Sequence, residues 1–286
     1  MNKKKIMLVI SAICMLLVLT GCSTNFDLIT LDTTFEDIKN AEGNGIFDLI
    51  LTFPLSQAIN FLTAKFNDNV FLAVVIVTVI LNVILLAFTY KSNLQMQKMQ
   101  SMQPEQMKIQ KKYEGRTDQA SQMRMSQELQ ALYKKYDINP MSALLVSFLQ
   151  FPVLIAMYSA VRRSAAVANG KFLGHTLATT PSEAFAQKAW PLVAIYVLMI
   201  AAQLLSVMLP QILNKIRAKK EADIHHRSVD VPQQQNAFMT YGLVVFIGFI
   251  MLNWPCALSL YYVITSVVNI IKTLALNQIS SKQLTK

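Results

Sequence analysis

The chain has 286 residues, a formal net charge of +10, 53% hydrophobic residues and only 15% charged residues. This composition is too apolar for a single soluble domain of that length and indicates a membrane protein. The basic residues fall in short clusters between apolar runs, without the basic face interleaved with aromatic residues that a nucleic-acid site needs. We therefore expect contacts with membrane lipids and no nucleic-acid specificity.

The first 21 residues have the three parts of a signal peptide. A cluster of three lysines, Lys3 to Lys5, precedes an apolar stretch of about 16 residues and a small-residue cleavage site. The site reads LTGC, which resembles the bacterial lipoprotein signal, in which the cysteine is acylated (palmitate) and becomes the first residue of the mature chain. We predict that residues 1–21 are removed and that Cys22 carries the lipid anchor. An uncleaved first transmembrane helix is the alternative.

Four apolar runs follow, and a spanning helix needs about 20 such residues. The last run, Ala237 to Ile271, has 35 residues and would be about 52 Å long as one helix, against a hydrocarbon core of about 30 Å. It must fold back, and Asn253-Trp254-Pro255 supplies the break because proline ends a helix. The sequence thus predicts an all-α membrane protein with five transmembrane helices, at residues 70–90, 141–161, 189–213, 237–253 and 256–276.

The charges between these runs predict the topology. A lipid-modified Cys22 would lie outside the cell, and five spans would then place the C-terminal tail, residues 279–286, in the cytoplasm. Residues 22–69 hold two lysines and seven acids, whereas residues 91–140 hold nine Lys and Arg, which agrees with the positive-inside rule. The loop from Arg162 to Lys188 disagrees, with four basic residues and one acid, and we expect its arginines to snorkel to lipid headgroups.

Two segments outside the spans are expected to be helical. Residues 49–64, in the extracellular tether 22–69, are uncharged but short, and we predict an amphipathic helix lying on the outer leaflet. Residues 91–140 contain two helical stretches around a polar turn at 114–118, which predicts a cytoplasmic helical hairpin. Six of the fifteen methionines fall in it. They would give an adaptable apolar surface for varied partners, or the two helices simply pack on each other.

Polar residues inside the predicted spans occur in pairs at helical spacing, so that each pair shares a face of its helix. Four such faces could converge on a wet groove within the bundle. Hydrogen bonds between helices, worth about 0.6 to 2 kcal/mol each in membranes, are an equally good reading. The pairs are Thr78 and Asn82, Ser147 and Gln150, Gln203 and Ser206, and Thr265 and Asn269.

The sequence lacks the residues that several classes of membrane protein need for their activity. The four apolar runs contain no Asp, Glu, Lys, Arg or His, which argues against ion-coupled transport and against an intramembrane serine protease. No glycine-rich phosphate loop is present, which argues against an ATP-driven pump. We therefore predict no enzyme activity, no catalytic residue, no metal site and no cofactor.

Two motifs, taken with the lipoprotein signal, resemble the YidC/Oxa/Alb family of membrane protein insertases in the short lipoprotein form of single-membrane bacteria. The first is KKYDINPMSALLVSFLQFPVLIAMYSAV, with Asn139, Pro140, Gln150 and Pro152, at the end of the hairpin. The second is NWPCALSLYYV, which joins the last two spans. The resemblance covers about residues 46 to 278 and implies an insertase core at residues 70–278.

The resemblance implies a five-helix bundle with a hydrophilic groove that is open to the cytoplasm and to lipid. A nascent protein's polar segment would enter the groove while its apolar segment slides into lipid, so the chain would act as insertase and chaperone. Nascent membrane proteins and lipids are the implied partners, with the ribosome and the Sec translocon as further ones. We assign the groove to Asn82, Thr78, Ser147, Gln150, Gln203, Thr265 and Asn269.

Asn82 departs from the family pattern, because the matching position usually carries an arginine. A positive charge that attracts acidic client residues is therefore not expected here. The alternative functions are a specialised paralog with narrowed insertion activity or a lipoprotein scaffold that keeps the fold, and a small-solute channel comes third.

Overall fold

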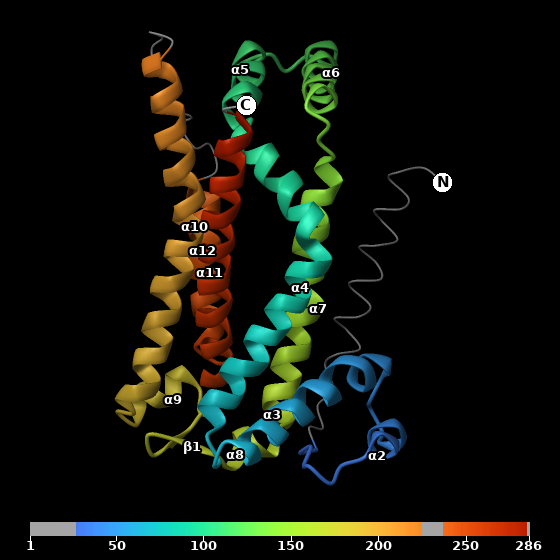
Figure 1. Ribbon diagram of the computed structural model, residues 1–286, viewed down its shortest axis with the longest axis vertical. Helices are drawn as coiled ribbons and strands as arrows, with labels where there is room; N and C mark the ends of the chain where they lie inside the picture. Colours follow the sequence, from blue (N-terminus) through green and yellow to red (C-terminus); the bar gives the residue numbers. More distant parts are fainter. Residues whose placement is uncertain (1–26, 225–236, 285–286) are drawn as a thin grey trace. The chain divides into compact units, whose positions relative to one another are not determined.

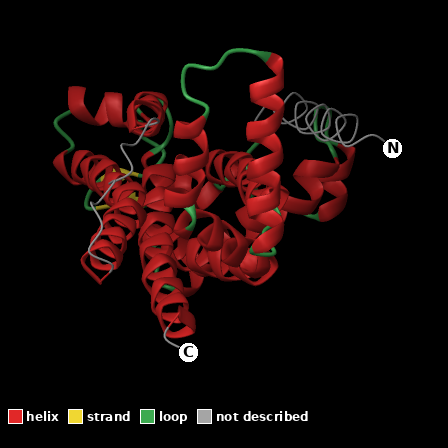
Figure 2. Ribbon diagram, turned by 90° about the horizontal axis from the view of Figure 1, so that it is seen from above, coloured by secondary structure: helices red, strands yellow, loops and turns green. Residues whose placement is uncertain are grey.

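The computed structural model describes residues 27–224 and 237–284, so the predicted signal peptide and Cys22 lie outside the described residues. Within them the chain is mostly helical (Figure 2). The elements are α2 (Phe35–Asn40), the π-helical turn η1 (Asp48–Thr52), α3 (Phe53–Lys65), α4 (Val70–Ser101), α5 (Gln103–Lys112), α6 (Gln119–Lys135), α7 (Pro140–Arg163), α8 (Ala165–Asn169), β1 (Lys171–Phe172), β2 (His175–Thr176), α9 (Pro181–Ala186), α10 (Trp190–Ile224), α11 (Ala237–Met251) and α12 (Cys256–Leu284).

The described residues form two compact units. The first takes them from 27–84, 148–203 and 243–268, and the second from 85–147, 204–224, 237–242 and 269–284. The long helices contribute residues to both units because each boundary between the units falls inside a helix.

Three helices are long and apolar enough to cross a membrane. They are Val70–Met99 in α4, Trp190–Leu213 in α10 and Cys256–Ala275 in α12. The predicted break at Asn253-Trp254-Pro255 is confirmed, since α11 ends just before it and α12 begins just after it. The five-span arrangement itself stays a prediction, because neither α7 nor α11 is among these candidates. Helix α11 has 15 described residues, and a full span needs about 20.

One hydrophobic core holds the first unit together. It joins the early part of α4 to α7, α10 and α12, with α3 and the α8–α9 loop packed at the end of the unit where these elements are labelled in Figure 1. Ile59, Met157, Leu192 and Leu258 are completely buried in it.

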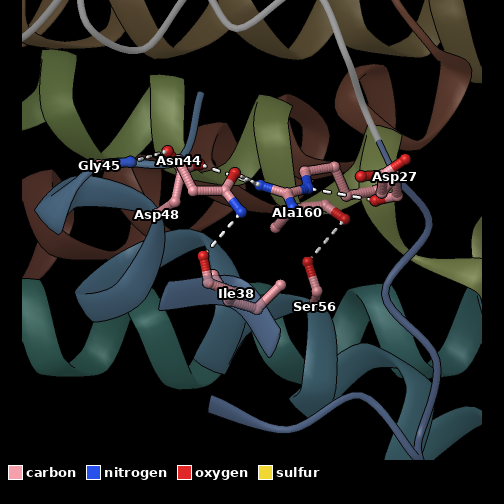
Figure 3. Close-up of polar contacts among 8 residues, drawn as sticks. Asp27, Ile38, Asn44, Gly45, Asp48, Ser56 and Ala160 are labelled. Atoms are coloured by element: carbon pink, nitrogen blue, oxygen red, sulfur yellow. Dashed lines mark hydrogen bonds and ion pairs between the residues drawn. The ribbon is translucent and has the colours of Figure 1, made fainter. Parts of the chain in front are cut away.

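The N-terminal segment of this unit is fixed to the end of α7 by a buried ion pair (Figure 3). The Arg163 guanidinium lies 3.3 Å from a carboxylate oxygen of Asp48, and the side chains are 2% and 7% exposed. Arg163 also donates a 2.8 Å hydrogen bond to Asn44 Oδ1 and a 3.3 Å bond to the backbone oxygen of Asp27. Arg163 therefore does not extend to headgroups as we expected, whereas Arg162 is exposed.

A second buried contact, made by Asn60 of α3, joins the N-terminal segment to the start of α8. Asn60 donates to the backbone oxygen of Ile29 at 2.6 Å, and its own oxygen accepts bonds from the Ser164 hydroxyl and the Ala166 amide. Every hydrogen-bonding atom of this buried amide group is therefore used, as burial of a polar group requires. Ile29 also pairs with Ser164 through the backbone.

The second unit contains α5 and α6, which contact each other around the turn that separates them. The Asp118 side chain caps α6 by accepting a bond from the Ser121 amide. Met102, Leu132 and Ile138 form a small buried cluster against which Met99 and Ile109 pack. Met99 and Met102 thus pack with Leu132 of α6, as expected if the two helical stretches simply pack on each other. Met123, in contrast, is 56% exposed.

Candidate functional site

The polar residue in the middle of α4 is bonded to a second helix. Asn82, only 8% exposed, donates a 2.9 Å bond to the Thr78 backbone oxygen and a 3.1 Å bond to the Thr265 hydroxyl on α12. Both N–H groups are used in this way. Within the described residues the side-chain oxygen of Asn82 accepts no hydrogen bond, and it is left available as an acceptor.

Thr78 does not take part in this interhelical contact through its side chain. Its hydroxyl donates a 2.7 Å bond to the Val74 backbone oxygen one turn earlier and is completely buried. A threonine that bonds back to its own helix has its polar group satisfied locally. The backbone oxygen of Thr78, rather than its hydroxyl, accepts the hydrogen bond from Asn82.

Two further amides also reach α12. The Gln150 side chain on α7 donates a 3.2 Å bond to the Tyr261 hydroxyl, and Gln203 on α10 accepts a 2.8 Å bond from the Ser266 hydroxyl. Both glutamines are half-buried, whereas Tyr261 and Ser266 are completely buried. Each amide is thus bonded at one end, and within the described residues its other end forms no hydrogen bond.

Helix α12 is therefore the common partner of α4, α7 and α10. Its contributions, Tyr261, Thr265 and Ser266, lie within six residues of one another. The sequence reasoning found Thr265 but missed the other two. The signal for Tyr261 was its spacing of four residues from Thr265, which places both on one face of the helix. No such spacing pointed to Ser266.

The other predicted site residues are Asn269, Ser147 and Cys22. Asn269 belongs to the second unit, where its side-chain oxygen accepts a 2.8 Å bond from the Lys272 ammonium. Lys272 lies inside the candidate span Cys256–Ala275, just beyond the uncharged run. Ser147 is part of α7, but its side chain, like Cys22, lies outside what the structure describes.

The cluster offers hydrogen bonds and contains no carboxylate, amine, guanidinium or imidazole group. Its side chains are amides, aliphatic hydroxyls and the Tyr261 phenol, which donate and accept hydrogen bonds and are neutral at neutral pH. Among residues 27–224 and 237–284 no group of His, Cys, Asp and Glu could hold a metal ion. The arrangement can thus bind polar backbone or side chains inside an otherwise apolar set of helices.

Comparison with known proteins finds relatives along most of the chain. A model of the family described as "60Kd inner membrane protein" matches residues 61–283. The chain is 29% identical over 268 residues to "Membrane protein insertase YidC 2" of Bacillus anthracis, covering 94% of this chain and 91% of that protein. It is 26% identical over 271 residues to "Membrane protein insertase MisCA" of Bacillus subtilis, covering 95% and 90%. A 30% identity to "Membrane protein insertase YidC 1" of Halalkalibacterium halodurans spans 57% of this chain and 59% of that one.

Proposed function

Because this chain belongs to the 60Kd inner membrane protein family, the family of the YidC/Oxa/Alb membrane protein insertases, we propose that it inserts nascent integral membrane proteins into the cell membrane and helps them to fold. The observation that carries the proposal is similarity along nearly the whole of both chains, 94% of this chain and 91% of the Bacillus anthracis insertase. The similarity therefore includes the helices that hold the polar cluster.

The polar cluster supplies a physical route for a client. The available oxygen of Asn82 and the available amide ends of Gln150 and Gln203 would bind a client's polar segment in a hydrophilic groove, and so replace the hydrogen bonds that the segment loses on leaving water. The client's apolar segment would meanwhile enter lipid. Burial of apolar surface, at about 25 cal/mol per Å², would drive the transfer without a nucleotide.

The proposal includes an orientation. Lipid-modified Cys22 lies outside the cell, the chain crosses the membrane five times, and the α5–α6 segment and the C-terminus lie in the cytoplasm. The excess of Lys and Arg between residues 91 and 140 supports this orientation. The ribosome and the Sec translocon are the proposed cytoplasmic and membrane partners, and insertion proceeds with or without the translocon.

One departure supports a second candidate. Asn82 stands where the resemblance leads us to expect an arginine, so the groove has no positive charge at that position. The alternative is a specialised paralog or lipoprotein scaffold with the insertase fold and narrowed or reduced insertion activity. A neutral amide would favour clients whose outer segments carry few acids.

Depletion of the protein followed by quantitative proteomics of the membrane tests these candidates. An insertase predicts loss of integral membrane proteins from the membrane and their accumulation as unprocessed or aggregated chains. A scaffold predicts intact insertion with loss of one complex only. A narrowed paralog predicts that the lost proteins share outer segments poor in acidic residues. Solute flux through reconstituted vesicles, if it exceeded that of empty vesicles, would instead indicate a channel.

A further inference from the structure

A strained hairpin presents an apolar side chain at its tip. Strands β1 and β2 pair Phe172 with His175, so the turn between them has two residues, Leu173 and Gly174. Both have positive φ, 50° for Leu173 and 88° for Gly174, as in the type I′ turn that favours Asn-Gly. Leucine is poorly suited to that conformation, and its side chain is 70% exposed. The leucine is therefore unfavourable both for the backbone and, in water, for the side chain.

The hairpin is held against the first turn of a candidate membrane span. The Phe172 ring stacks on the ring of Phe71, the second residue of α4, with centroids 4.5 Å apart and planes 15° apart. At Gly170, just before the hairpin, an added Cβ would lie 3.2 Å from the Val70 Cβ and would collide with the Ala166 backbone oxygen. This close approach fixes Leu173 near the level at which α4 enters the membrane.

The surroundings have the composition of a membrane interface. Candidate span α10 begins at Trp190, which is 65% exposed, and tryptophan favours the boundary between headgroups and acyl chains. Lys171 and Lys188 are both exposed; Lys171 lies two residues before Leu173, and Lys188 lies two residues before Trp190. Lysine side chains at a membrane interface extend their ammonium groups to the level of the headgroups, where lipid phosphates lie.

We propose that the hairpin Lys171–Thr176 is a membrane anchor, with Leu173 inserted among lipid acyl chains and Lys171 and Lys188 bound to lipid headgroups. A lipid surface fits better than a protein partner, because a single two-residue tip is far smaller than the roughly 1,000 Å² that a specific protein interface buries. The anchor does not depend on insertase activity.

The anchor also explains the basic residues of the loop from Arg162 to Lys188, which faces outside in the predicted topology although the positive-inside rule disfavours basic loops there. Of its four basic residues, Arg163 is paired with Asp48 inside the protein. Lys171 and Lys188 would be neutralised by anionic headgroups. Three of the four basic residues of the loop are then compensated. Asp48 of the chain neutralises Arg163, and lipid headgroups neutralise Lys171 and Lys188.

Spin labelling tests the proposal in vesicles of phosphatidylcholine and phosphatidylglycerol. A label at Leu173→Cys in the full chain should be several-fold more accessible to oxygen than to an aqueous nickel reagent, and its mobility should change when phosphatidylglycerol is omitted. Glu42→Cys, at an exposed acidic position, is the matched control and should favour the nickel reagent. The unsubstituted chain gives the background labelling.

Two outcomes overturn the proposal. A label at position 173 that is as open to the nickel reagent as the one at position 42 would show that the tip lies in water. A label shielded from both reagents would show that protein covers it. Should the substituted chain fail to fold, photoactivatable lipids applied to the unsubstituted chain decide: crosslinks within residues 171–175 support the anchor, and crosslinks confined to the spans contradict it.

Discussion

At the residue scale, Asn82 combines two roles that are usually considered as alternatives. Its N–H groups bond to Thr78 and Thr265 as an interhelical contact would, while its oxygen accepts no bond within the described residues. Asn82→Leu should therefore lower the free energy of unfolding by about 0.6 to 2 kcal/mol. It should also reduce insertion of clients with polar outer segments by more than this loss of stability explains. Thr265→Ser, which keeps the hydroxyl, is the matched control.

Asn82→Arg separates the two roles further. If the side chain faces a wet groove, the charge meets water, and the variant should accumulate normally and insert clients with acidic outer segments more efficiently. The measurements are its level in the membrane, client insertion, and the reaction of Asn82→Cys with a water-soluble thiol reagent. An arginine variant that does not accumulate, together with an unreactive thiol at position 82, would leave the amide as a structural contact only.

Arg163 gives the clearest stability prediction. Arg163→Met would leave Asp48 as an uncompensated buried charge, which typically destabilises a protein by about 3 to 5 kcal/mol. The neighbouring Arg162→Met removes an exposed charge and should cost no more than about 1 kcal/mol. Unfolding in detergent, followed by circular dichroism, compares the two variants. Equal destabilisation would mean that the ion pair does not hold the N-terminal segment on α7.

At the element scale, a surface contact joins α5 and α6, and we predict that it depends on pH. Glu128 accepts bonds from the Lys112 ammonium at 2.6 Å and the Tyr113 hydroxyl at 2.7 Å. These bonds, that of Lys112 first, hold the pKa of Glu128 below its usual value, and Glu128 raises the pKa of Lys112. Because the pKa of Glu128 is lowered, the contact stabilises the packing of α5 on α6 at pH values above the usual carboxylate pKa. This stabilisation is lost as the pH falls through the lowered pKa of Glu128. The raised pKa means that it is lost again as pH rises through the pKa of Lys112.

Spin labels on α5 and α6 measure this dependence. Their distance distribution should be narrow near neutral pH and should broaden on acidification below the lowered pKa of Glu128. Glu128→Gln should give a broader distribution at neutral pH and little further change in acid. The same broadening in acid for both proteins would assign the pH effect to another group.

The ends of helices and the turns between them could be predicted from the sequence more fully than the contacts between residues that are distant in the chain. Proline and a polar turn act locally, so the break before α12 and the turn between α5 and α6 could be placed from the residues alone. Helical spacing likewise showed which polar residues share a face. It could not show that Asn82 bonds to Thr265, 183 residues away, or that Arg163 pairs with Asp48, 115 residues away. Such pairs depend on tertiary packing, and no local pattern encodes them.

At the scale of the whole molecule, the proposed topology makes two linked predictions. Cys22→Ala should leave an unprocessed precursor and abolish incorporation of labelled fatty acid, because the acylated cysteine is the proposed anchor.

A thiol introduced as Arg116→Cys, between α5 and α6, should react with a membrane-impermeant reagent only after the cells are opened. Labelling of position 116 from outside intact cells would contradict the orientation of the entire chain.

Reconstitution tests the proposed insertase activity most directly. The purified chain is incorporated into vesicles without the Sec translocon or nucleotide, and a newly synthesised single-span client with a short polar outer segment is added. We predict that the client's outer segment becomes protected from external protease in proportion to the amount of chain, and that a photocrosslinker at position 82 links to the client during insertion. Protection no greater than in empty vesicles, with no crosslink from position 82, would contradict insertion through the polar cluster.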